Sequence, residues 1–259
     1  MKVVLLAGGL GTRLREETEF KPKPMVEVGG FPVLWHIMKS FDHYSFNEFI
    51  VCLGYKGEII KNYFLNFQTQ HNDFEINTSK QGSLNILSSE NISNWKVTLA
   101  DTGDDSMTGE RIRRIKKYIP EGETFMMTYG DGLSDINIDE LLEFHNSHNG
   151  LATISTTNPS SRFGVVEIGN ENKILEFKEK PVSDGDINMG YMVLDYGVFD
   201  FINEGDVFEK DPLIKLSETE NLYAYQHSGF FEPMDTYREN LALNKLWNQD
   251  KAPWKKWND

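Results

Sequence analysis

The chain has 259 residues, of which 39% are hydrophobic, 12% aromatic and 25% charged, a balance that is ordinary for a soluble globular protein. Its formal net charge of −14 argues against nucleic acid or an anionic membrane as a partner, since both attract basic surfaces. The only cysteine, Cys52, excludes an intramolecular disulfide, and no apolar stretch approaches transmembrane length. We therefore expect a cytoplasmic protein in which local basic residues hold any anionic ligand.

Strand-like and helix-like segments alternate along the first half of the chain. Apolar runs predict strands at 3–7, 48–55, 95–103 and 124–132. Helical spacing of apolar residues predicts helices at 32–41 and 58–67, and a basic helix with apolar positions at Ile112, Ile115 and Ile119. The polar stretch 68–94 predicts only short strands or loops. This alternation predicts an α/β fold whose largely parallel sheet is covered on both faces.

From residue 151 onward the pattern changes. Residues 151–157, 163–169 and 173–179 look like antiparallel strands, and 191–202 look like a strand followed by a helix. Residues 211–218 and 236–247 have the pattern of helices. No Pro-, Gly- or Ser-rich linker and no internal repeat divides the chain. We expect a single domain over 1–259, with an amino-terminal part at 1–135 and an elaborated carboxyl-terminal part at 136–259.

The most informative segment directly follows the first predicted strand. Gly-Gly-Leu-Gly-Thr-Arg at 8–13 is a glycine-rich turn, and Lys21 and Lys23 follow on a proline-stiffened segment. Backbone N–H groups of such a turn form an anion-binding nest, and Arg13 adds a planar charged fork that suits phosphate. The spacing matches neither the dinucleotide-binding fingerprint nor the P-loop. A plain strand-to-helix turn is the alternative, but the basic residues favour phosphate binding.

Two aspartates also follow apparent strands. Asp131 lies in Tyr-Gly-Asp-Gly and Asp235 in Pro-Met-Asp-Thr. If both reach one edge of the sheet, they could hold Mg²⁺, which binds through one or two carboxylates together with substrate phosphates. The alternative for each residue is an ordinary turn aspartate.

Further polar residues are candidates for binding a phosphorylated sugar. Lys180 could reach its phosphate and Glu179 a hydroxyl, although a solvated charge pair before a proline turn is the simpler alternative. Asn188 could bind sugar hydroxyls or belong to an ordinary turn. No nucleophile signature is visible, so the candidates fit phosphoryl or nucleotidyl transfer, which needs positioning and charge neutralisation. A solvated helix face is predicted for the basic run Arg111, Arg113, Arg114, Lys116 and Lys117.

Several motifs together resemble the signature of sugar-1-phosphate nucleotidyltransferases, beginning with GGLGTRL and KPKPM. The similarity continues through YGDG, RFGVVE, FKEKP, INMGY and PMDT, so it covers nearly the whole chain. VTLADTGDDSMTG, LWHIMK and KAPWKKW resemble the glucose-1-phosphate cytidylyltransferase branch in particular. The resemblance implies a Rossmann-like α/β/α sandwich with a mixed, mostly parallel sheet. It also implies Mg²⁺-assisted, in-line conversion of CTP and glucose 1-phosphate to CDP-glucose and pyrophosphate, for surface-polysaccharide dideoxysugars.

The resemblance also implies a role for each site residue. Arg13 would bind the leaving pyrophosphate, Lys23 would neutralise the nucleotide phosphates, and Asp131 and Asp235 would carry Mg²⁺. The nucleotide would bind to residues in the 1–135 part, namely Leu6, Gly8, Gly9, Gly11, Thr12, Arg13, Lys23, Thr108 and Gly109. The sugar phosphate would bind to residues in the 136–259 part, namely Gly164, Glu179, Lys180 and Asn188.

Two residues depart from the pattern of the branch, which usually has glycine at both positions. Glu110, near the base pocket, could alter the choice of nucleotide, and Met189 could narrow the sugar pocket. UTP or dTTP as the donor therefore stays open, as does a non-catalytic regulatory protein that binds sugar nucleotides. The aromatic tail could fold back on the core or be buried against a neighbour, and it leads us to expect a homo-oligomer. Its tryptophans are Trp247, Trp254 and Trp257.

Overall fold

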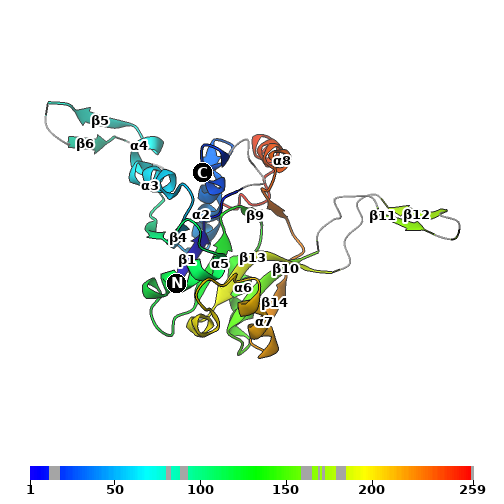
Figure 1. Cartoon of the computed structure of the whole chain (residues 1–259). Helices are drawn as coiled ribbons and strands as arrows, with labels where there is room; N and C mark the ends of the chain where they lie inside the picture. The colour runs from blue at the N-terminus through cyan, green and yellow to red at the C-terminus, as the bar shows by residue number, and fades with distance from the viewer. Residues whose placement is uncertain are drawn as a thin grey trace.

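A seven-stranded sheet forms the centre of the computed structural model, with strand order β14-β10-β13-β8-β1-β4-β7 (Figure 1). The strands are β1 (Lys2–Leu6), β4 (Glu48–Leu53), β7 (Lys96–Asp101), β8 (Phe125–Tyr129), β10 (Ala152–Thr157), β13 (Ile187–Leu194) and β14 (Leu222–Gln226). All of them except β13 run in the same direction. The predicted mixed, mostly parallel sheet is therefore confirmed. The structure describes residues 1–11, 18–79, 83–87, 93–158, 170, 173–178 and 185–257, and the backbone of 165–168.

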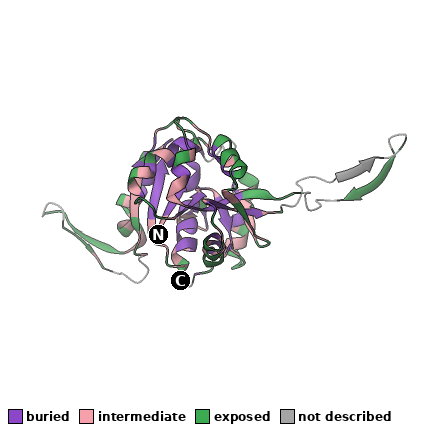
Figure 2. Ribbon diagram, turned by 90° about the horizontal axis from the view of Figure 1, so that it is seen from below, coloured by how far each residue is buried: buried purple, intermediate pink, exposed green. Residues whose placement is uncertain are grey.

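Helices cover both faces of the sheet because side chains alternate along its buried strands. Val3 and Leu5 of β1 pack in a cluster with α2 (Val33–His43), α3 (Gly57–Leu65), α6 (Ile138–Asn146) and α8 (Tyr237–Asn248). Val4 and Leu6 face the other cluster, with α5 (Thr108–Ile115), α7 (Asp211–Glu218) and the 3₁₀ helix η4 (Tyr196–Phe201). The shorter helices are η1 (Lys23–Met25), α4 (Phe67–His71) and η2 (Lys116–Tyr118). Figure 2 shows these buried layers inside the body.

The carboxyl ends of the parallel strands meet at one edge of the sheet, which is where ligands bind in open α/β folds. Because β13 runs in the opposite direction, its amino end lies at the same edge. Asn188 pairs there with Thr156, near the end of β10. The ordinary turn that was the alternative for Asn188 is not observed, because β13 already begins at Ile187. Met189 is buried in the core, and its effect on a sugar pocket stays a prediction.

Two β-hairpins extend away from the body (Figures 1 and 2). One pairs β5 (Phe74–Asn77) with β6 (Ser83–Ile86), and the other pairs β11 (Val165–Ile168) with β12 (Ile174–Lys178). Both confirm the predicted short or antiparallel strands of these regions. Their exposed apolar side chains include Phe74, Ile76, Leu84, Ile174, Leu175 and Phe177.

The carboxyl-terminal tail packs on the core of its own chain. Trp254 and Trp257 are buried in the larger cluster, and the Trp254 indole N–H donates to Nδ1 of His36 at 3.4 Å. Burial lowers the pKa of His36 to about 4, so the ring is neutral and Nε2 donates to the Val28 carbonyl at 2.8 Å. The homo-oligomer stays a prediction, now without support from this tail. In the part of the chain that the structure describes, no helix has the length and apolar character needed to span a membrane.

Candidate active site

Lys23 lies between the two aspartates that the sequence singled out. Its Nζ is 2.6 Å from Oδ2 of Asp131 and 2.6 Å from Oδ1 of Asp235. Lys23 is on η1, whereas the aspartates follow strands that are 104 residues apart in the sequence (235 − 131). The three charged groups therefore form one centre at the carboxyl edge of the sheet.

A short ladder brings the two aspartates together. Asp131 lies between β8 and β9 (Gly132–Ser134), and β9 pairs antiparallel with β15 (Phe231–Pro233), which ends just before Met234 and Asp235. The Met234 N–H donates to the Asp131 carbonyl at 2.9 Å. A capping box of α8 then holds the next turn, since Glu239 accepts from the N–H groups of Asp235 at 2.6 Å and Thr236 at 2.8 Å.

The electrostatics of this centre favour a cation. Burial alone would lower the pKa of Lys23, but the charges of Asp131 and Asp235 and their hydrogen bonds outweigh it, so the pKa is raised. The ammonium stays charged, and its neighbours carry two negative charges against its one.

The two carboxylates also suit a divalent metal ion. Each places an oxygen 2.6 Å from the Lys23 Nζ, which occupies the point between them, so a metal ion would have to displace the ammonium or bind the second oxygen of each carboxylate. Carboxylate oxygens are the ligands that hard divalent ions prefer. Among the described residues no group of three or more His, Cys, Asp or Glu side chains that could hold a metal ion occurs.

A cavity of about 590 Å³ opens beside Lys23, a size typical of small-ligand sites. It lies between the glycine-rich turn after β1, the loop before α5 and the ends of β8 and β15. The lining residues are Leu6, Ala7, Gly8, Gly9, Leu10, Gly11, Lys23, Pro24, Asp104, Asp105, Ser106, Met107, Thr108, Arg111, Tyr129, Gly130, Asp131 and Asp235.

Arg111 is a buried residue in the lining of this cavity. It is only 4% exposed, so its assignment to a solvated helix face is wrong. Its guanidinium donates to five oxygens: the carbonyls of Gly8 (2.9 Å), Leu53 (3.0 Å), Gly103 (2.8 Å) and Asp104 (3.1 Å), and the Thr102 hydroxyl (2.9 Å). One side chain therefore ties the glycine-rich turn to the ends of β4 and β7.

The close approach of Arg111 explains the glycine at position 8. A Cβ there would lie 2.2 Å from Nη1 of Arg111 and 2.9 Å from the Gly54 nitrogen. Arg111 was not predicted as a site residue because it belongs to a run of basic residues, which is typical of a solvated helix face. Helical periodicity contains the signal, since Arg111 lies one turn before the apolar position Ile115 and shares its face.

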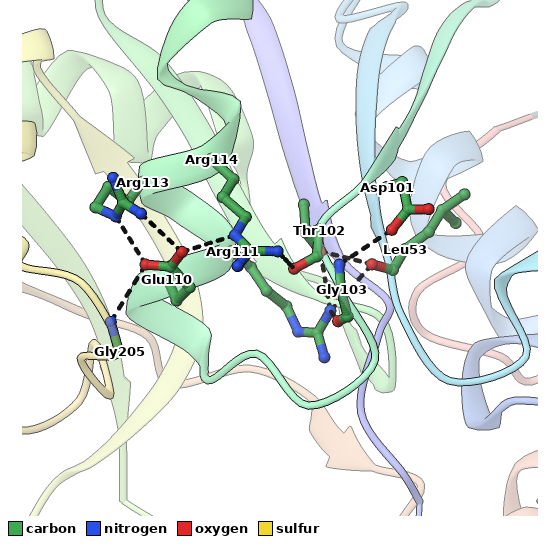
Figure 3. Close-up of polar contacts among 9 residues, drawn as sticks. All are labelled: Leu53, Asp101, Thr102, Gly103, Glu110, Arg111, Arg113, Arg114 and Gly205. Atoms are coloured by element: carbon green, nitrogen blue, oxygen red, sulfur yellow. Dashed lines mark hydrogen bonds and ion pairs between the residues drawn. The ribbon is translucent and has the colours of Figure 1, made fainter.

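Glu110 is not among the lining residues of the cavity, and its expected effect on the choice of nucleotide stays a prediction without support from a direct contact. Its carboxylate accepts from Arg113 at 2.7 and 2.8 Å, from Arg114 at 2.6 Å and from the Gly205 N–H at 3.2 Å (Figure 3). These hydrogen bonds, led by that of Arg113, lower its pKa to about 2 despite the opposing effect of burial. Glu110 therefore fastens α5 to the turn at Gly205.

The structure brings most of the expected nucleotide-binding residues onto the cavity, namely Leu6, Gly8, Gly9, Gly11, Lys23 and Thr108, together with the expected metal ligands Asp131 and Asp235. Gly109 and Asn188 are not among the lining residues. A Cβ on Gly109 would lie 2.7 Å from the Asp206 carbonyl, so that glycine permits close packing of α5. The expected residues that lie outside the described part of the chain are Thr12, Arg13, Gly164, Glu179 and Lys180.

Comparison with known proteins identifies the family. The model of the nucleotidyl transferase family matches residues 2–259. The chain belongs to the nucleotidyl transferase family. Members of this family generally use a divalent metal ion, which agrees with the convergent carboxylates.

Curated relatives of this nucleotidyl transferase match over almost its whole length. It is 45% identical over 259 residues to glucose-1-phosphate cytidylyltransferase of Salmonella typhimurium, covering 99% of this chain and 100% of the relative. It is 43% identical, with the same coverage, to a probable glucose-1-phosphate cytidylyltransferase of Bacillus subtilis.

Solved structures share the fold. A putative glucose-1-phosphate thymidylyltransferase from Bacillus anthracis superposes with a TM-score of 0.70 at 18% identity, covering 100% of this chain and 98% of that chain. A UDP-glucose pyrophosphorylase from Acinetobacter baumanii superposes with a TM-score of 0.69 at 18% identity, covering 96% and 93%. The nucleotidyltransferase fold expected from the sequence is therefore confirmed.

Proposed function

We propose that this nucleotidyl transferase forms CDP-glucose and pyrophosphate from CTP and glucose 1-phosphate. The observation that carries the proposal is the 45% identity over 259 residues to a glucose-1-phosphate cytidylyltransferase. The charged centre at Lys23, Asp131 and Asp235 opens onto a cavity and supports a reaction between phosphates. Neither uridylyl transfer, thymidylyl transfer nor a purely regulatory role has a comparable observation in its favour.

In this proposal the nucleotide enters the cavity with its phosphates over the glycine-rich turn. Backbone N–H groups at Gly8, Gly9 and Gly11 can approach phosphate oxygens closely because no Cβ intervenes. Lys23 neutralises charge on the triphosphate next to the reacting phosphorus, and Arg13 binds the leaving pyrophosphate. Such positioning and electrostatic stabilisation supply most of the rate in phosphoryl-type transfers.

The acceptor is glucose 1-phosphate, whose phosphate oxygen attacks the α-phosphorus of CTP in line. A P–O bond to this oxygen forms while the bond to the β-phosphate oxygen breaks, and pyrophosphate leaves with the electron pair. Lys180 would hold the sugar phosphate, and Gly164, Glu179 and Asn188 would line the glucose site. No protein nucleophile is needed, so no covalent enzyme intermediate is expected.

Mg²⁺ is the divalent ion proposed for the site. Asp131 and Asp235 would hold it, since their carboxylates both contact Lys23 and line the same cavity, and carboxylate oxygens are the ligand type that Mg²⁺ prefers. When bound, it would neutralise charge on the triphosphate that the protein alone leaves uncompensated.

A panel of nucleotides tests the proposal. Pyrophosphate release is measured with glucose 1-phosphate, Mg²⁺ and each of CTP, UTP, dTTP, ATP and GTP. The proposal predicts release with CTP well above the others. Release with UTP alone would contradict the cytidylyl assignment, and no release with any nucleotide would contradict the enzyme assignment.

A further inference from the structure

One carboxylate outside the cavity connects two parts of its wall. Glu209 lies between η4 and α7 and is not among the lining residues. Its Oε2 accepts a hydrogen bond from the Thr108 hydroxyl at 2.6 Å, and its Oε1 accepts one from the Tyr129 phenol. Thr108 begins α5 and Tyr129 ends β8, and both line the cavity. Each oxygen of one side chain therefore fixes one wall residue.

The segment before Glu209 fastens the first turn of α5. The Phe208 N–H donates to the Thr108 hydroxyl oxygen at 2.9 Å, so this hydroxyl both accepts and donates. The Glu110 N–H donates to the Asp206 carbonyl at 3.2 Å. In the preceding residue, the Gly205 N–H donates to the Glu110 carboxylate. The Thr108 side chain is therefore held in one orientation by groups about one hundred residues distant in the sequence.

Two contacts fix the orientation of the Tyr129 side chain. Its phenol binds Glu209, and its ring packs against the bare backbone of Gly190, where a Cβ would lie 2.1 Å from the ring. Gly190 has a φ of +85°, which disfavours any other residue there. Tyr129 also lies two residues before Asp131 in the sequence. Its orientation thus determines the shape of the wall next to the charged centre.

We propose that Glu209 is a positioning residue for the nucleotide, acting through Thr108 and Tyr129. The inference rests on the proposed function, because it takes the ligand of this cavity to be a nucleoside triphosphate. A carboxylate can accept from both hydroxyls at once, one on each oxygen. A glutamine in its place has a single acceptor oxygen and an NH₂ group, so at least one of the two hydroxyls loses its acceptor.

Loss of the hydrogen bonds of Glu209 should weaken nucleotide binding more than it slows the chemical step. A wall residue that is free to rotate must be ordered when the nucleotide binds, which reduces affinity. Among the described residues, Glu209 has no hydrogen bond to any of the three charged residues at the reacting centre. The turnover of the bound complex should therefore change little.

Nucleotide affinity and initial rates of Glu209→Gln test the inference. The affinity for CTP is measured calorimetrically without glucose 1-phosphate, and KM for CTP and kcat are measured with it. We expect affinity to fall and KM to rise by about three- to tenfold, the cost of ordering one freed side chain when the nucleotide binds, with kcat within about twofold of wild type. The matched control is Glu218→Gln on α7, an exposed glutamate that should leave all three values unchanged.

Two further variants keep the test decisive. Tyr129→Phe removes only the phenol hydroxyl and should also raise KM, even if Glu209→Gln folds poorly. Combining Thr108→Val with Glu209→Gln should cost less than the sum of the single effects, since both break one contact. A lower unfolding temperature of Glu209→Gln with unchanged CTP affinity would overturn the inference and leave only a structural role.

The proposed function is tested by a different measurement, namely nucleotide binding and turnover by the wild-type protein. If wild type binds and turns over another nucleotide, the same variants are measured with that nucleotide, and equal affinity of wild type and Glu209→Gln contradicts the inference. If wild type binds no nucleoside triphosphate, both the proposed function and the inference are wrong.

Discussion

Replacing Arg111 by lysine should destabilise the protein, because a lysine cannot satisfy the oxygens that the guanidinium binds. Arg111 donates to five oxygens, whereas an ammonium has three N–H groups, so at least two acceptors lose one donor. The Gly8 carbonyl also accepts from the Tyr55 N–H at 3.2 Å and the Leu53 carbonyl from the Thr102 N–H at 3.0 Å, so neither is left without a donor. The cost is therefore that of losing hydrogen bonds to a charged group, about 1.5–3 kcal/mol each. The bonds to Gly103 and Asp104 are only part-buried, so water can replace them at less cost. We therefore expect a loss of about 2–4 kcal/mol in the free energy of unfolding.

Urea unfolding followed by tryptophan fluorescence measures this loss. The matched control is Arg113→Lys on the same helix. Its partly exposed side chain binds the single carboxylate of Glu110, and a lysine can keep the ion pair. Such an ion pair at the surface contributes little to the stability of the fold. If Arg111→Lys lost no more stability than Arg113→Lys, the five hydrogen bonds of Arg111 would not stabilise the fold.

Three further variants test other parts of the site. Gly8→Ala should lose about 1–3 kcal/mol of stability in urea unfolding because its Cβ meets Arg111 at 2.2 Å, whereas Gly9→Ala, with nothing within 4 Å, should unfold like wild type. Equal losses would contradict the close-approach argument. The pKa of Glu110 is about 2 in the folded protein instead of its ordinary 4.5, so the ionised carboxylate stabilises the fold. The difference in the free energy of unfolding between wild type and Glu110→Gln should therefore be fully present above pH 4.5 and shrink as the pH falls toward 2. Its upper limit is about 3 kcal/mol and solvent screening of the arginines reduces it; a difference that stays constant from pH 7 to pH 3 would refute the ion-pair assignment. Asp235→Asn should lower kcat at saturating Mg²⁺ by about a hundredfold or more, and near-wild-type turnover would remove Asp235 from the metal site.

The charged centre was predictable from the sequence only in part. Asp131 follows an apolar run, and the carboxyl ends of parallel strands meet at one edge, which places Asp131 there. That Asp235 joins it was implied only by the family resemblance. The pairing of β9 with β15 was not predictable, because strands of three residues carry no clear periodicity. This ladder helps to bring Asp235 within reach of Lys23.

The supporting residues could not be assigned from local patterns. Glu110 is next to a nucleotide-binding motif in the sequence, but its direction depends on Gly205, 95 residues later. Glu209 lies in a connection without any motif, and only the tertiary structure reveals its contacts with Thr108 and Tyr129. Arg111 could have been found from the helical face that it shares with Ile115.

The identity of the products tests the central claim most directly. Purified protein is incubated with CTP, glucose 1-phosphate and Mg²⁺, and the phosphorus NMR spectrum is followed over time. We predict equal amounts of CDP-glucose and pyrophosphate, and no consumption of CTP when glucose 1-phosphate is left out. Consumption of CTP without a sugar nucleotide, or no consumption at all, would contradict the account.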